Sequence, residues 1–155
     1  MAPEHMQTLA MLPLFDTLEQ SELEKLSELT AVKQFSVGED ILCEGKPAWA
    51  MYVILEGSVA VLKAREEQMD TIVELQAGEV LGEVELIDQS LCCATVRALE
   101  DVETILVSKN NFEAFLRSQP VAATKIMRQM VHILATRLRE SNINYSSLMA
   151  ITESM

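Results

Sequence analysis

The chain has 155 residues, of which 49% are hydrophobic, and its formal net charge is −12. This length and composition predict one soluble globular domain with a substantial core. The acidic balance argues against direct nucleic-acid binding, which needs clustered Lys and Arg. No apolar run approaches the ~18 residues that cross a bilayer, and the start of the chain lacks a basic signal-peptide region. We therefore expect a cytoplasmic protein without direct contact to nucleic acid or membrane.

The three cysteines are Cys43, Cys92 and Cys93. So few cysteines fit a reducing compartment better than a disulfide framework. If the adjacent pair lies on a strand, Cys92 and Cys93 point to opposite faces, one toward a pocket and one away from it. The simpler interpretation is that both fill space as small hydrophobes, and the alternative is a redox or metal role.

The first predicted helix covers residues 19–29. Leu23, Leu26 and Leu29 recur at helical spacing, and Ser21 followed by Glu24 offers a capping box as an alternative start. We expect this N-terminal part, residues 1–30, to act as a scaffold.

From residue 30 the apolar period changes from 3.6 toward 2, which indicates short strands. Turn signals at Gly38, Gly45, Gly57 and Gly78 separate these strands, and residues 63–70 are expected to form a polar hairpin tip. The predicted strands cover residues 32–35, 40–43, 51–55, 58–62, 71–75 and 104–107. Many short strands at regular spacing predict an antiparallel sandwich or barrel.

The last part of the chain is predicted to be helical. Ser108 is a candidate N-cap for a short helix that ends before Pro120, and a long helix then runs from about residue 120 to about 149. Ile126, Met130 and Ile133 form a stripe suited to packing on the strands.

A second apolar stripe follows the same long helix at alternating three- and four-residue steps, which is typical of a seam with an identical helix. It contains Val131, Leu134, Leu138, Ser141, Tyr145 and Leu148. We predict a parallel homodimer whose interface includes Val131, Leu134, Leu138, Tyr145 and Leu148. The alternative is that both stripes are buried within one chain.

The most informative stretch covers residues 78–98. It reads Gly78-Glu79-Val80-Leu81-Gly82-Glu83-Val84-Glu85-Leu86-Ile87 and, after a short polar loop, Cys92-Cys93-Ala94-Thr95-Val96-Arg97-Ala98. Residues 84–87 could form one helical turn whose free N–H groups point toward Gly82, and such a turn attracts an anion. The neighbouring Glu83 offers a carboxylate that accepts hydrogen bonds, as sugar hydroxyls require.

This order of residues resembles the cyclic-nucleotide-binding domain of CRP/FNR regulators, protein kinase A regulatory subunits and nucleotide-gated channels. The resemblance implies that Gly82 is the glycine of the phosphate-binding cassette, that Glu83 holds the ribose 2′-OH, and that Thr95 is the Ser or Thr after the family's alanine. It implies a mainly β fold with flanking helices: an antiparallel jelly-roll β-barrel (double-stranded β-helix) with an N-terminal helix and a long C-terminal dimerisation helix. The whole chain, 1–155, is then one domain with a β-roll over 31–108 and C-terminal helices over 109–155.

The sequence departs from the family pattern at two cassette positions. Cys92 stands where the family has the arginine that pairs with the cyclic phosphate, and Glu85 stands where the family usually has Ala or Gly. Losing one partner of a buried charge pair costs ~2–5 kcal/mol, or roughly two to three orders of magnitude or more in affinity. Glu85 adds repulsion toward a phosphate, and Arg97 occupies a position that the family uses elsewhere.

Two polar residues of the long helix, Ser141 and Asn142, fall about where bacterial family members contact the nucleotide base. The predicted ligand-binding residues are therefore Gly82, Glu83, Val84, Cys92, Cys93, Thr95, Ser141 and Asn142. The ligand is a cyclic nucleotide (cAMP or cGMP) or another small anion, no cofactor is assigned with certainty, and no metal is expected.

These observations predict a non-catalytic regulatory or sensor domain in signal transduction. His5 and His132 are far apart in sequence, and none of the common nucleophile, metalloprotease or P-loop motifs is present. The chain ends near the point where CRP/FNR regulators continue into a winged helix-turn-helix, so we expect a lone sensor domain or a fragment whose output passes through a protein partner. The alternative is a degenerate fold used as an interaction or scaffold module without a nucleotide ligand.

Overall fold

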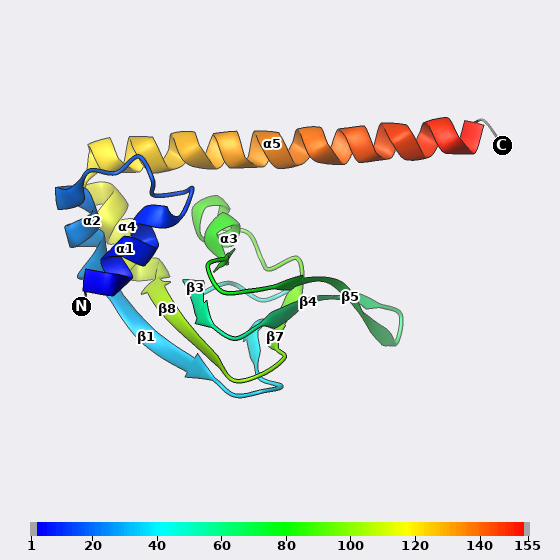
Figure 1. Ribbon diagram of the computed structural model, residues 1–155, viewed down its shortest axis with the longest axis horizontal. Coiled ribbons are helices and arrows are strands. Elements are labelled where there is room, and N and C mark those ends of the chain that lie inside the picture. The colour runs from blue at the N-terminus through cyan, green and yellow to red at the C-terminus, as the bar shows by residue number, and fades with distance from the viewer. Residues whose placement is uncertain (1–2, 154–155) are drawn as a thin grey trace.

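The computed structural model describes the backbone of residues 3–153 and the side chains of residues 5–141. Figure 1 shows a roll of β-strands with short helices gathered at one end and one long helix running across the top and past the roll. The predicted fold class, mainly antiparallel β with flanking helices, is confirmed.

Two helices precede the strands, α1 (Pro3–Met11) and α2 (Gln20–Ser27). The sequence pattern did not predict α1, whose Leu9 is completely buried in the core. The helix predicted over 19–29 is confirmed as α2, but its capping box uses Glu19 and Glu22. The Glu19 backbone N–H donates to Glu22 Oε1 at 2.8 Å, so the alternative start at Ser21 is wrong.

Within residues 3–153, eight strands form two four-stranded sheets in which every pair is antiparallel. One sheet has the order β1-β8-β3-β6 and the other β2-β7-β4-β5. The strands are β1 (Thr30–Phe35), β2 (Asp40–Leu42), β3 (Ala50–Glu56), β4 (Val59–Arg65), β5 (Gln68–Leu75), β6 (Val80–Leu81), β7 (Thr95–Ala98) and β8 (Val102–Ser108).

All six predicted strands are present, but the hairpin between β4 and β5 is longer than expected. The strands stay paired out to Arg65 and Gln68, so only Glu66 and Glu67 form the tip. The polar sequence gave no sign of this extension. A two-stranded ladder is held by backbone hydrogen bonds, so its projecting end needs no buried apolar side chain.

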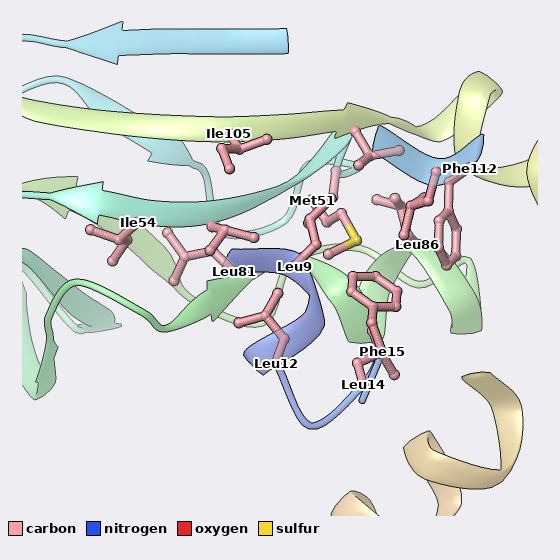
Figure 2. Close-up of a cluster of buried hydrophobic side chains, with 14 of the residues drawn as sticks. Leu9, Leu12, Leu14, Phe15, Met51, Ile54, Leu81, Leu86, Ile105 and Phe112 are labelled. Atoms are coloured by element: carbon pink, nitrogen blue, oxygen red, sulfur yellow. The ribbon is translucent and has the colours of Figure 1, made fainter. Parts of the chain in front are cut away.

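The core lies between the sheets and continues under the N-terminal helices. Met51 and Ile54 of β3 and Ile105 of β8 are each at most 1% exposed, and Leu9 and Phe15 close the end of the roll. Figure 2 shows these side chains converging from strands and helices that are distant in sequence. This continuous core fixes the N-terminal segment and the cassette against the same strands.

The C-terminal part contains α4 (Lys109–Ser118) and α5 (Pro120–Glu153). Ser108 is the N-cap of α4, because its hydroxyl accepts the Asn111 backbone N–H at 3.1 Å. On α5, Ile126 and Met130 are buried in the core, which confirms the first predicted stripe.

The second stripe of α5 faces outward. Val131, Leu134 and Leu138 are 68%, 39% and 62% exposed. Tyr145 and Leu148 lie outside the described side chains. Within residues 3–153, none of the helices is both long enough and apolar enough to cross a membrane.

Candidate functional site

The cassette begins where β6 turns into the short helix α3 (Glu83–Asp88). Gly82 makes this turn with φ of 81°, and a Cβ built on it would lie 2.9 Å from the Ala50 carbonyl oxygen. Only glycine combines this left-handed backbone with so close an approach to β3. The helical turn predicted at residues 84–87 is confirmed as part of α3.

A cavity of about 240 Å³ lies beside this turn. Four of the predicted ligand-binding residues line it, namely Gly82, Glu83, Val84 and Cys93. Apolar residues of the strands also line it, and so does Arg137 of α5. The structure thus brings the cassette and the long helix together at one cavity.

Arg137 pairs with Glu83 at the rim of this cavity. Arg137 Nη2 lies 3.7 Å from Glu83 Oε1, and the two side chains are 60% and 12% exposed. Burial raises the pKa of the Glu83 carboxyl above its ordinary value, the Glu85 carboxylate raises it further, and the charge of Arg137 opposes both effects. Sequence reasoning did not select Arg137, and the available signal was its place one helical turn before Ser141.

Glu85 is a half-buried wall residue of the same cavity. Among the described residues, no hydrogen-bond donor or cation contacts its carboxylate. Of the described residues that line the cavity, Arg137 alone is a cation, and two carboxylates line the cavity with it. The first turn of α3 therefore presents negative charge where the sequence pattern suggested an anion site.

Cys92 lies outside the cavity, contrary to its predicted place among the ligand-binding residues. Its side chain is 3% exposed and belongs to the hydrophobic core. Its backbone N–H donates to the Lys46 carbonyl and its carbonyl accepts the Gly45 N–H, each at 2.8 Å. Burial is the main cause that raises the pKa of its thiol, which makes it a weak nucleophile.

The cysteine pair nevertheless divides as expected between inside and outside. Cys93 is exposed and lines the cavity, whereas Cys92 points into the core. Both residues precede β7, so their side chains point in different directions because of the irregular segment before the strand. The prediction had assumed that alternation along a strand would do this. In the described part of the chain, no group of three or more His, Cys, Asp or Glu residues is placed to hold a metal ion.

Thr95 and Ser141 do not line the cavity either. Thr95 is buried, and its hydroxyl accepts the Glu44 backbone N–H at 3.0 Å, so it fastens β7 to the end of β2. Ser141 is exposed on α5, and the side chain of Asn142 lies outside the described residues. Arg97 is engaged away from the cavity, with its Nε 2.7 Å from Asp40 Oδ1.

A larger cavity of about 360 Å³ lies on the other side of the Glu83–Arg137 pair. Its walls are mostly apolar and come from the segment after α1, the end of β5 and α5, including Leu12, Leu75 and Met130. The sequence did not reveal this space, because its walls meet only in the folded chain.

Comparison with known proteins finds a family match over the strands and α4. Residues 32–119 match the family model described as the cyclic nucleotide-binding domain. Glutaminase 1 of Bradyrhizobium diazoefficiens is 31% identical over 134 residues, which are 86% of this chain and 21% of that protein. The chain spans at most 62% of the length of the other curated relatives compared with it.

Solved structures show the same architecture. The N-terminal domain of a transcriptional regulator from Streptomyces coelicolor has 26% identity and a TM-score of 0.74, over 87% of this chain and 94% of that chain. The regulatory subunit of a cAMP-independent protein kinase A from Trypanosoma cruzi, bound to guanosine, has 28% identity and a TM-score of 0.66. That match covers 73% of this chain and 41% of the kinase subunit.

Proposed function

Because this chain belongs to the cyclic nucleotide-binding domain family, we propose that it is a non-catalytic regulatory domain whose cavity prefers an uncharged nucleoside to a cyclic nucleotide. The family membership, predicted from residues 78–98, is confirmed. The choice of ligand is our inference, and it rests above all on Glu85.

The Glu85 carboxylate lines the cavity without a donor from the described part of the chain. A half-buried carboxylate needs hydrogen-bond donors, and the free hydroxyls of a nucleoside can supply them. A cyclic phosphate has only acceptors and a negative charge, so it would be repelled. With Cys92 in the core in place of an arginine, no cassette cation offsets this repulsion.

The sugar side of the cavity keeps the features that the family resemblance implies for ribose binding. Gly82 allows close approach to the backbone, and Glu83 presents an acceptor to the 2′-OH. Arg137 orients Glu83 through the ion pair at 3.7 Å. A nucleoside shares this ribose with a cyclic nucleotide, so losing the phosphate site does not remove ribose recognition.

The Trypanosoma cruzi relative supports a nucleoside ligand. That protein is described as cAMP-independent and bound to guanosine, at 28% identity to this chain. A protein that contains a domain of this architecture can therefore bind a phosphate-free ligand, which is the chemistry that we derive here from Glu85.

We further propose that α5 transmits occupancy of the cavity. Lys125 Nζ lies 2.7 Å from Glu22 Oε1, and Gln129 Nε2 lies 2.7 Å from Asp16 Oδ1, so the first half of α5 is fixed to the N-terminal segment. Arg137, farther along, holds α5 through a longer and more exposed ion pair. A ligand that engages Glu83 changes this weaker contact and thereby shifts the population of α5 positions.

The exposed stripe on α5 supports a homodimer in which a second copy packs along Val131, Leu134 and Leu138. Leu138→Asp would place a charge in this seam, and we expect it to convert the dimer to monomer in light scattering coupled to size-exclusion chromatography. Arg139→Asp is the control for a charge change on the same turn. A wild-type monomer would contradict the dimer proposal.

The alternative function is an interaction or scaffold module with no nucleotide ligand. Its supporting observation is that Arg137 already pairs with Glu83, so the ribose acceptor is occupied within the chain. In either case the output requires a protein partner.

Isothermal titration calorimetry distinguishes these functions. The purified chain is titrated with guanosine, adenosine, cAMP and cGMP, each up to about millimolar concentration. We expect at least one nucleoside to bind at least tenfold more tightly than either cyclic nucleotide. Tighter binding of cAMP or cGMP would contradict our ligand assignment, and absence of heat with all four would favour the scaffold alternative.

A further inference from the structure

An exposed aromatic residue lies in the connection between β2 and β3. Trp49 is 71% exposed and is the single tryptophan of the sequence. Pro47, two residues earlier, forms an antiparallel bridge with Leu91, which is itself 59% exposed. Tryptophan is seldom left so open to water, and an indole beside two more apolar side chains has the composition of a binding surface.

The chain holds Trp49 outward with a well-anchored backbone. Its carbonyl accepts the Lys109 N–H at 2.8 Å, and the Lys46 carbonyl accepts the Cys92 N–H at 2.8 Å. Ala48 and Ala50, on either side, are each 4% exposed, so alternation along the extended segment directs the indole to the surface. Trp49 is therefore presented on a fixed support, which lowers the entropy lost on binding.

Two lysines lie close to Trp49 along the backbone. Lys46 is three residues before it, and the Lys109 backbone N–H donates to the Trp49 carbonyl at 2.8 Å. Neither lysine has a carboxylate oxygen within 4.0 Å among the described residues. Both are therefore available to pair with acidic groups of a partner.

We propose that Pro47, Trp49 and Leu91, with Lys46 and Lys109 at the edge, form a docking surface for an acidic protein segment that carries an aromatic or aliphatic side chain. The apolar side chain would cover Trp49, and the acidic groups would pair with the two lysines. This surface is separate from the nucleoside cavity, so the proposal does not depend on which ligand the cavity takes.

Charge distinguishes this partner from two other occupants. A second copy docked face to face would oppose the same lysines across a twofold axis, which is repulsive. Anionic lipid or nucleic acid could satisfy the two lysines, but the net charge of −12 repels both polyanions at longer range. A short acidic segment carries few charges and places them only at the docking surface, so the rest of the acidic chain repels it less than it repels a polyanion.

The test is a selection of random dodecapeptides displayed on phage against the full chain. We expect enriched peptides to combine Asp or Glu with Phe, Trp or Leu. A synthetic peptide of the most enriched sequence should shift the emission of Trp49 to the blue, which reports burial of this indole directly.

Three variants locate the binding site of that peptide. Trp49→Ala should weaken peptide binding at least tenfold, as measured by fluorescence anisotropy of labelled peptide. Lys46→Glu combined with Lys109→Glu should do the same, while circular dichroism confirms that both variants fold. Lys33→Glu, an exposed lysine of β1, is the matched control and should leave affinity unchanged. Enrichment of basic or charge-free peptides, or equal binding to Trp49→Ala, would overturn the proposal.

Discussion

The two sides of the cassette cavity, which we assign to the sugar and to the phosphate of a nucleotide, differ in the features that form them. On the sugar side, Gly82 and the Glu83–Arg137 pair follow from a backbone turn and a contact with α5. On the phosphate side, Glu85 brings a carboxylate and Cys92 turns into the core. Under our proposal the turn keeps its geometry, while Glu85 and Cys92 leave the phosphate side without a positive charge. We therefore expect substitution of Gly82 to affect fold and binding together, substitution of Arg137 to affect binding alone, and substitutions on the phosphate side to change ligand choice.

The largest effect is expected at Gly82. Gly82→Ala would place a side chain at φ of 81° and a Cβ 2.9 Å from the Ala50 carbonyl oxygen. The two penalties together should lower the free energy of unfolding by about 2–4 kcal/mol in urea denaturation. Gly78→Ala is the matched control, because φ is 93° there but no heavy atom lies within 4 Å, so about 1 kcal/mol should be lost. Equal losses would show that contact with β3 does not constrain the turn.

A smaller effect is expected at Arg137. Arg137→Met removes the ion pair with Glu83 and should weaken nucleoside binding about fivefold to tenfold, measured by calorimetry. Stability should change by less than about 0.5 kcal/mol, because the guanidinium is 60% exposed and such pairs contribute little to folding. Arg139→Met is the control on the same helix, and an equal loss of affinity there would refute a specific role for Arg137.

The smallest effect is a pH dependence that originates at Glu83. Its pKa is raised by burial, so the folded protein takes up this proton at a higher pH than an exposed glutamate does. As pH falls through that raised pKa, Glu83 loses the charge that holds Arg137 and part of its capacity to accept the ribose hydroxyl. Nucleoside affinity should therefore decrease by about twofold to threefold as the pH is lowered through that raised pKa, measured by calorimetry over a pH series.

Stability linked to the same group changes in the opposite sense. A carboxyl with a raised folded pKa disfavours folding at pH values above that pKa, and this penalty is relieved as pH falls below it toward the pKa of the unfolded state. Glu83→Gln should remove the pH dependence of binding, because glutamine does not titrate but has nearly the same shape and still accepts a hydrogen bond. An unchanged pH profile in Glu83→Gln would assign the titration to another group.

Much of the fold was predictable because its signals are local. Alternating apolar residues and glycine turns indicated six of the eight described strands, all but β6 and β7, and the Ser108 N-cap and Pro120 indicated the starts of α4 and α5. α1 was not predicted, and its Leu9 joins a core that is built largely from residues distant in the sequence. The dimer seam at Tyr145 and Leu148 and the single-domain boundaries stay predictions.

The site was less predictable, since it combines a local motif with a tertiary contact. The cassette pattern placed Gly82, Glu83, Val84 and Cys93, which do line one cavity. It could not show that Cys92 packs inward, because the direction of that side chain depends on backbone bonds to the loop at Gly45. Arg137 is more than fifty residues away, and only packing of α5 on the roll brings it to Glu83.

The most direct test of the central claim compares guanosine and cAMP affinities in the wild type, in Glu85→Ala and in Glu85→Ala combined with Cys92→Arg. Asp88→Ala controls for loss of an exposed carboxylate on α3, and the single Glu85 variant keeps the test valid if arginine is not tolerated in the core. We predict that Glu85→Ala weakens guanosine binding and strengthens cAMP binding, and that the double variant binds cAMP at least tenfold more tightly than the wild type. Unchanged affinities for both ligands in Glu85→Ala would contradict the claim that Glu85 selects an uncharged ligand.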